Sequence, residues 1–154
     1  MRLISRYILT ASIVTVSSLM GATQTDTLKA NINNLTSNQI AKQNKTIVKM
    51  AAEEISKTLP QSVDKYTALV SVKADGTTLV YSFDINTGAK SDSAVIKEDK
   101  DRMKRAIVKG LCRSSLRFLE GDINIKYIYW SAKSKKELFS FLVTKQDCPE
   151  RNYK

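Results

Sequence analysis

The chain contains two stretches in which apolar residues recur at steps of three and four, the period of one face of an α-helix. The first stretch runs from about Asn38 to Thr58, and Ser37 or Thr36 can cap it. Pro60 follows, and proline disfavours helical geometry in the residue before it. The pattern therefore predicts a helix that ends near residue 58, with an apolar face formed by Ile40, Ile47, Ala51, Ile55 and Leu59.

A second helix is predicted from about Ser93 to Leu111, and Cys112 stands at its end. The segment 114–121 (SSLRFLEG) can add one short helical turn, which Gly121 ends. The apolar face of the second helix is formed by Val95, Ile96, Met103, Ala106, Ile107 and Gly110.

Between these helices, residues 67–85 (TALVSVKADGTTLVYSFDI) alternate between apolar and polar around an Asp-Gly pair. Alternation is the period of a half-buried strand, and Asp-Gly is typical of a two-residue type I′ hairpin turn. We therefore predict a hairpin with Asp75 and Gly76 as its loop. Its register pairs Val72 with Leu79, Val70 with Tyr81, and Ala68 with Phe83, which places six apolar side chains on one face.

A second hairpin is predicted near the end of the chain, with strands at 123–130 and 138–143 and a loop at 133–135. Its register pairs Tyr129 with Phe139, Tyr127 with Phe141, and Ile125 with Val143, which gives one face rich in aromatic residues. The opposite face pairs Trp130 with Leu138, so that face is partly apolar and is a candidate contact surface.

The order helix, hairpin, helix, hairpin predicts an α+β fold, in which a four-stranded antiparallel sheet carries both helices on one face. We assign this single domain to residues 38–150. A polar linker (23–37) precedes the domain and a short tail (151–154) follows it. The pattern leaves open whether both hairpins join one sheet.

The first 22 residues form a separate segment. Arg2 and Arg6 precede an uncharged apolar stretch from Tyr7 to about Ala22, which is the layout of a signal peptide. The apolar stretch is short for a membrane span, which needs about 20 residues. No cysteine follows it, so it is not a lipoprotein signal. We therefore predict export to the periplasm, with an uncleaved membrane anchor as the alternative.

Export determines how the only two cysteines, Cys112 and Cys148, are interpreted. An even number of cysteines in a small domain of an oxidising compartment predicts a disulfide, with a metal pair or a catalytic thiol as alternatives. The chain has no histidine, the commonest general base and metal ligand. The bridge is therefore the favoured interpretation, and we expect a protein that is not an enzyme and has no cofactor and no metal.

Several of these segments resemble a group of small exported two-cysteine proteins of Gram-negative bacteria. The resemblance rests on the pattern Leu-Pro-x-x-Val-Asp-x-x-Thr in 59–69 (LPQSVDKYTAL), on LVYSF and EGDINIKYIYW, and on the two cysteines. It covers about Ile47 to Cys148 and implies export and a disulfide, but no activity. The predicted architecture is also similar to that of small periplasmic accessory proteins of secretion systems, such as pilotins. Those proteins usually carry a lipid-attachment cysteine, which this chain lacks.

Of the net charge of +10, about +7 lies in the chain from Lys97 onward, and its most distinctive pattern is on the second predicted helix. Arg102, Arg105, Lys109 and Arg113 are spaced by three, four and four residues and therefore share one helical face, and Arg117 lies nearby. No acidic residue occurs from Arg102 to Leu119. A solvated surface is the plainest explanation. However, solvated faces usually mix signs, and a face of one sign favours an anionic partner.

The sequence thus predicts an exported, non-enzymatic binding protein, an accessory or inhibitory subunit of a secretion, envelope or toxin–immunity system. The expected partner is a protein with an acidic surface, with an anionic membrane surface as the second choice and nucleic acid disfavoured. Carriers of small molecules or lipids and small envelope enzymes or enzyme inhibitors are the alternatives. The predicted contact residues are Arg102, Arg105, Lys109, Arg113, Arg117, Trp130 and Leu138.

Overall fold

The computed structural model describes residues 36–148. The predicted signal peptide (1–22), the predicted linker up to residue 35 and the predicted tail (151–154) lie outside the described residues. Thr36 caps the first helix, as one of the two predicted capping residues, and Ser37, which we assigned to the linker, is the first residue of that helix. None of the helices within 36–148 is both long enough and apolar enough to span a membrane.

The first helix, α2 (Ser37–Ser56), matches the predicted helix to within two residues at either end. The Thr36 hydroxyl accepts a hydrogen bond from the Gln39 amide, and the Gln39 side chain accepts one from the Thr36 amide. This capping box satisfies two donors at the start of the helix. The buried face is rotated from the predicted one: Val48 and Ala52 are buried, whereas Ile40 and Ile47 are 40% and 37% exposed.

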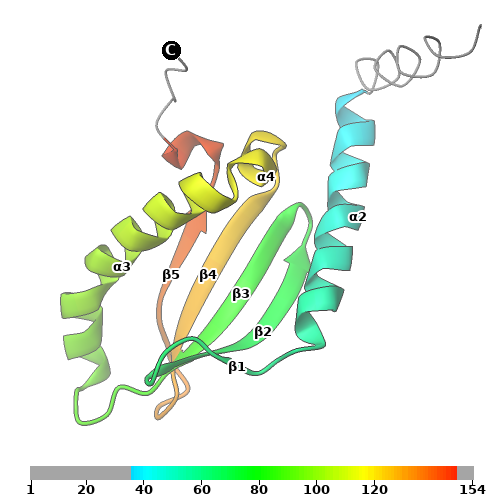
Figure 1. Ribbon diagram of the computed structural model, residues 1–154. Coiled ribbons are helices and arrows are strands. Elements are labelled where there is room, and N and C mark those ends of the chain that lie inside the picture. Colours follow the sequence, from blue (N-terminus) through cyan, green and yellow to red (C-terminus); the bar gives the residue numbers. More distant parts are fainter. Residues whose placement is uncertain (1–35, 149–154) are drawn as a thin grey trace, which may run out of the picture. The chain divides into compact units, whose positions relative to one another are not determined.

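The sheet has five strands, in the order β1-β2-β3-β4-β5 (Figure 1). All neighbouring strands are antiparallel except β3 and β4, which are parallel. The predicted four-stranded, fully antiparallel sheet was therefore wrong in strand number and in the direction of one pair, although both hairpins do join one sheet. The strands are β1 (Gln61–Ser62), β2 (Thr67–Asp75), β3 (Thr78–Ile85), β4 (Asn124–Ser131) and β5 (Glu137–Val143).

The parallel pair follows from the length of the second helix, α3 (Asp92–Ser114), which connects β3 to β4. A helix of 23 residues spans about 35 Å, more than the roughly 26 Å of an eight-residue strand. The helix therefore returns the chain to the end of the sheet where β3 begins. A strand that starts there beside β3 must run parallel to it. The short predicted turn after α3 is present as α4 (Leu116–Glu120), and Gly121 follows it.

The register of the first hairpin differs from the predicted one by one residue at the turn. Its two-residue loop is Gly76 and Thr77, so Asp75 pairs with Thr78 and Val72 pairs with Tyr81. Gly76 has φ 58°, a value that glycine adopts without steric cost and that hairpin turns of the primed types require. A bulge at Val70 then places Leu69, rather than Ala68, opposite Phe83.

The second hairpin has the predicted register through Tyr129–Phe139, Tyr127–Phe141 and Ile125–Val143. Beyond Tyr129 the register shifts, and Trp130 pairs with Glu137 instead of Leu138. Leu138 is only 6% exposed and belongs to the main hydrophobic cluster. The predicted Trp130–Leu138 pair on the outer face is therefore wrong, because the bulge moves Leu138 into the core.

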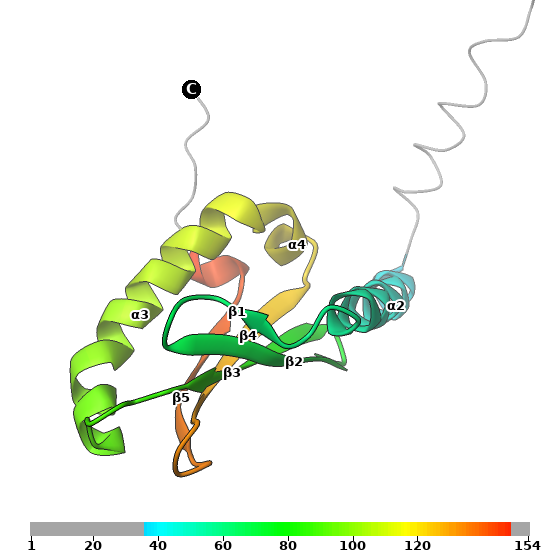
Figure 2. The ribbon, with the colours of Figure 1, turned by 60° about the horizontal axis from the view of Figure 1, so that its bottom comes forward.

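One hydrophobic core joins both long helices to the sheet. In Figures 1 and 2, α2 lies beside β2 and α3 lies beside β5, at opposite edges of the sheet. Val48 of α2 and Val95 of α3 belong to the same buried cluster as Phe83, Tyr129 and other residues of the sheet. The prediction that both helices pack on one face is thus confirmed. The predicted aromatic face is also present, with Phe83 stacked on Tyr129 at 4.9 Å between ring centroids.

Candidate functional site

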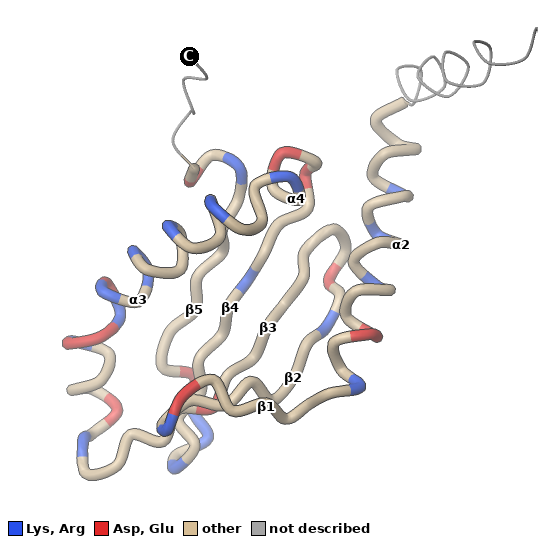
Figure 3. Tube along the Cα trace, viewed as in Figure 1, with Lys and Arg blue, Asp and Glu red and all other residues tan. Residues whose placement is uncertain are grey.

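The predicted basic face lies along the second half of α3, where lysine and arginine recur at its surface (Figure 3). Arg105, Lys109 and Arg113 are all exposed. They follow one another at steps of four residues, which places them in a row with about 6 Å between neighbours along the helix axis. We call Arg105, Lys109 and Arg113 the basic row.

A second row runs parallel to the basic row and is apolar. It consists of Val108, Cys112 and Leu116, which are all half-buried. Leu116 is the first residue of α4, and it continues the spacing of four residues beyond the end of α3. The sequence analysis missed this apolar row, although its signal was present: each member lies one residue before or three residues after a member of the basic row.

The two rows line one open hollow of about 680 Å³ on the outside of α3, which we call the α3 hollow. Lys104 and Cys148 complete its lining. None of its described lining residues is acidic. The hollow therefore combines half-buried apolar side chains with exposed cations, and we call the apolar row and the disulfide its floor.

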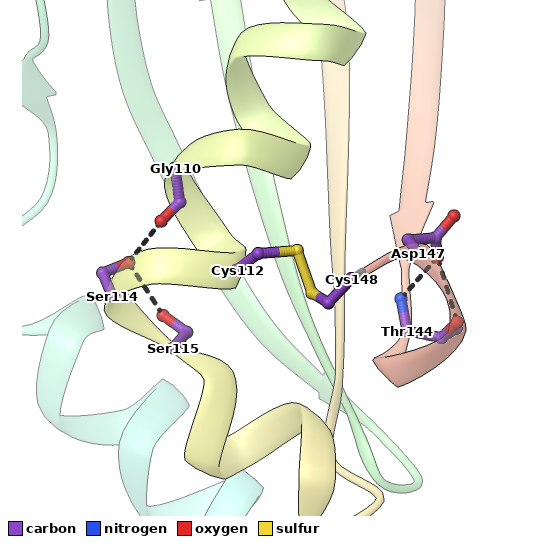
Figure 4. The surroundings of a disulfide bond; sticks show 7 residues. All are labelled: Gly110, Cys112, Ser114, Ser115, Thr144, Asp147 and Cys148. Carbon is purple, nitrogen blue, oxygen red and sulfur yellow. Dashed lines mark hydrogen bonds between the residues drawn. A yellow bond between two sulfur atoms is a disulfide. The ribbon is translucent and has the colours of Figure 1, made fainter. Parts of the chain in front are cut away.

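The disulfide between Cys112 and Cys148 holds this floor together (Figure 4). The Cα atoms are 5.4 Å apart, and the bridge links α3 to the chain that follows β5, as predicted. The short helix η1 (Lys145–Asp147) leads into Cys148, and the Thr144 amide donates a 2.8 Å hydrogen bond to the Asp147 carboxylate. On the other side, the Ser114 hydroxyl donates to the Gly110 carbonyl at 3.1 Å. Cys112 thus lies within the last turns of α3, and Cys148 directly follows the capped helix η1.

The cations of the α3 hollow have no carboxylate partner among residues 36–148, a property that they share with other exposed lysines such as Lys97 and Lys100; what sets them apart is that four of them line one hollow. Arg102, by contrast, pairs with Asp99 at 2.6 Å, and Lys145 pairs with Asp122 at 2.6 Å. Lys104 and the basic row form no such ion pair within the described residues. Four neighbouring cations without a counter-charge from the described part of the chain generate a positive potential that attracts an anionic group.

The helix dipole explains only part of this charge distribution. Asp92 lies in the first turn of α3 and Arg113 in the last turn, and both positions suit the signs of the helix ends. That effect fades within one turn of the helix end. Lys104 and Arg105 lie more than two turns before Ser114 and therefore gain little from it.

The remaining predicted contact residues do not join this site. Arg102 lines a different hollow, and Arg117 belongs to α4 without lining the α3 hollow. Trp130 alternates with the core residue Tyr129 along β4, so it lies on the face of the sheet that faces away from the helices. Leu138 is in the core. The structure thus brings together only Arg105, Lys109 and Arg113 of the seven predicted contact residues.

The hollow that Arg102 lines has about 670 Å³ and carries both signs of charge. Backbone hydrogen bonds from Tyr66 and Thr67 hold the pKa of Asp64 below its ordinary value, and the hydrogen bond with Glu98 raises the pKa of Lys90. Arg102 and Asp99 neutralise each other there. Because these charges are already paired or stabilised within the chain, this hollow exerts less pull on a charged partner than the α3 hollow does.

Within residues 36–148, no group of three or more His, Cys, Asp or Glu side chains is placed to hold a metal ion.

The strongest pKa shifts occur at tyrosines of the core face. Burial raises the pKa of Tyr127 to about 12, and burial also raises the pKa of Tyr129 and of Tyr81. These hydroxyls are therefore neutral at physiological pH.

Comparison with protein families gives one match. The model of the domain of unknown function DUF8479 matches residues 42–139, which run from within α2 to the beginning of β5 and include all of β1 to β4, α3 and α4. No curated protein matches the chain.

Three solved structures share the fold. One is PA3611 of Pseudomonas aeruginosa, a protein inferred to be secreted, with a TM-score of 0.63 and 12% identity over 71% of this chain and 96% of that chain. The second is EpsS, the pilotin of the Vibrio vulnificus type 2 secretion system, with a TM-score of 0.63 and 12% identity over 75% of this chain and 100% of that chain. The third is AspS, the type II secretion system pilotin of Vibrio cholerae, with a TM-score of 0.57 and 18% identity over 72% of this chain and 97% of that chain.

Proposed function

Since the chain belongs to the DUF8479 family and shares its fold with two pilotins, we propose that it is an exported, non-enzymatic accessory protein of a secretion system. In this proposal it acts in the periplasm by binding another protein. The single observation that carries the binding role is the α3 hollow. Its exposed cations supply attraction and orientation, and its apolar floor supplies the area whose burial stabilises a complex.

The shape of the α3 hollow favours a protein partner over a membrane surface. A peripheral protein binds a bilayer by inserting protruding apolar side chains below the headgroups. Here Val108, Cys112 and Leu116 are half-buried, while the cations beside them are exposed. A flat bilayer can reach the cations but not the floor, whereas a protruding protein segment can reach both. An acidic protein is therefore the partner that fits best.

Charge reversal tests the proposal. The full-length R105E/K109E variant, expressed in its native host, should capture its envelope partner at least tenfold less efficiently than the wild type in a tagged pull-down. The matched control is K97E/K100E, which makes the same charge change on exposed residues in the first half of the same helix, outside the α3 hollow. Capture that is unchanged in R105E/K109E, or reduced equally in both variants, would contradict the proposal.

The proposed location has a separate test. Export predicts that the protein recovered from the periplasm has the intact mass of a chain without the signal peptide. Oxidation predicts that this mass rises by the two hydrogen atoms of a disulfide on reduction. A full-length chain with free thiols recovered from the cytosol would contradict it.

A further inference from the structure

We propose that the segment bound in the α3 hollow is an acidic amphipathic helix of the partner protein. This inference rests on the proposed function and specifies the chemistry of its partner. It follows from the arrangement of two neighbouring rows, one basic and one apolar, along α3 and onto the start of α4.

The spacing of the rows matches a helix. Within α3 the basic row, and Val108 and Cys112 of the apolar row, repeat every four residues with about 6 Å between neighbours along the helix axis, and Leu116 continues the apolar row on α4. A second helix presents side chains with the same repeat, and two helices pack when the rows of one fit the grooves of the other. An apolar row on the partner would meet Val108, Cys112 and Leu116, while an acidic row beside it would meet Arg105, Lys109 and Arg113.

An extended strand fits less well. Successive side chains of a strand point to opposite faces, so one face of a strand presents a single row. A single strand can therefore satisfy the basic row or the apolar floor, but not both together. A helix carries apolar and acidic rows side by side on adjacent faces.

The length of the site sets the length of the partner segment. Lys104 and Leu116 mark the two ends of the lining along the chain. The lining residues on α3 itself run from Lys104 to Arg113, which is nine helical steps or about 14 Å, and Leu116 extends the lining onto α4, so a partner helix of about 12 to 14 residues covers the hollow. The Cys112–Cys148 disulfide in the centre of the floor fixes the position of Cys112 against the chain end that follows β5, which keeps the floor formed before binding.

Synthetic peptides test this inference on the full chain in its oxidised form. The first probe is a helical peptide of about 14 residues with a leucine row flanked by a glutamate row. Two matched peptides replace all glutamates by lysine or all leucines by serine. The readout is the change in amide NMR signals together with the dissociation constant from calorimetry. A fourth probe, vesicles rich in phosphatidylglycerol, tests the membrane surface.

The expected result is binding of the leucine–glutamate peptide with signal changes at Val108, Lys109 and Leu116. The R105E/K109E variant should bind this peptide at least about tenfold more weakly than the wild type does. The K97E/K100E variant should bind it like the wild type. Equal binding of the lysine or serine peptide would overturn the inference, and so would binding of the vesicles through the same residues without binding of the peptide.

Failure of this inference is distinguishable from failure of the proposed function. If the peptide does not bind but R105E/K109E still loses the envelope partner, the helical segment is wrong and the proposed function stands. If R105E/K109E captures the envelope partner normally, the proposed function falls whatever the peptide does.

Discussion

Removing the Cys112–Cys148 disulfide should destabilise the domain by an amount set by the loop that it closes. The two cysteines are 36 residues apart in the sequence. In the chain-entropy model, closing a loop of that size removes about 13 cal/mol/K from the entropy of the unfolded chain. This corresponds to a loss of about 4 kcal/mol in the free energy of unfolding at 25 °C when the bridge is removed. Such a loss is a large share of the roughly 5–15 kcal/mol that stabilises a typical domain.

The C112A/C148A variant tests this magnitude by urea unfolding followed by circular dichroism. With a slope of about 2 kcal/mol per molar urea, the midpoint should fall by about 2 M. Wild-type protein unfolded in the presence of a reductant is the control, and it should show the same fall. A loss below about 1 kcal/mol in both samples would refute the reasoning, because the loop would then be closed by other contacts in the unfolded chain.

Three further predictions concern single side chains. Leu119→Ala should reduce the free energy of unfolding by about 2–5 kcal/mol, because Leu119 is fully buried and its loss leaves a cavity; a loss under 1 kcal/mol in urea unfolding would contradict this packing. Asn44→Ala should cost about 1–3 kcal/mol, because the Asn44 side-chain amide donates a 2.6 Å hydrogen bond to the Gly121 carbonyl; the exposed neighbour Lys45→Ala is the control and should be near neutral. Burial raises the pKa of Tyr127 to about 12, against 10 in the unfolded chain. The neutral Tyr127 hydroxyl therefore makes its full contribution to the free energy of unfolding below pH 10, and this contribution is lost as the pH rises towards 12. Tyr127→Phe should remove a late component from the ultraviolet titration of tyrosinate, and a titration curve identical to that of the wild type would contradict the assignment.

The parts of the fold that the sequence predicted are those with a strong local pattern. The capping residue and Pro60 placed α2 within two residues, and the export signal with an even cysteine count predicted the disulfide. In the second hairpin, aromatic residues on both strands specified the register from Ile125 to Tyr129. The helix and hairpin predictions depended on residues close to one another in sequence, or on a pattern that tolerates no shift, whereas the disulfide prediction depended on the compartment and the cysteine count.

The errors arose where a single residue or a distant contact decides the structure. At the first turn, Asp75-Gly76 and Gly76-Thr77 are both acceptable loops, and the conformation of Gly76 decided for the second. Bulges at Val70 and beside Trp130 have no pattern of their own in the sequence. The parallel pair was predictable in principle, because the length of α3 returns the chain to the start of β3.

The candidate site was predicted in part for the same reason. The steps of four residues placed Arg105, Lys109 and Arg113 on one face, and the structure has them there. Arg102 had the same periodic signal, but Asp99 lies one turn earlier and pairs with it. The apolar row escaped notice because neither Val108 nor Leu116 belongs to the predicted apolar face of the second helix, and only the structure shows that they line the same hollow as the cations.

Site-specific photocrosslinking in the native host tests the central claim most directly. A photoreactive residue in place of Lys109, whose side chain is exposed in the α3 hollow, should yield a discrete covalent adduct with an envelope protein after illumination. The same residue in place of Lys97, exposed on α3 but outside the hollow, should yield none. The account is contradicted if Lys109 gives no protein adduct, gives only phospholipid adducts, or gives the same adducts as Lys97.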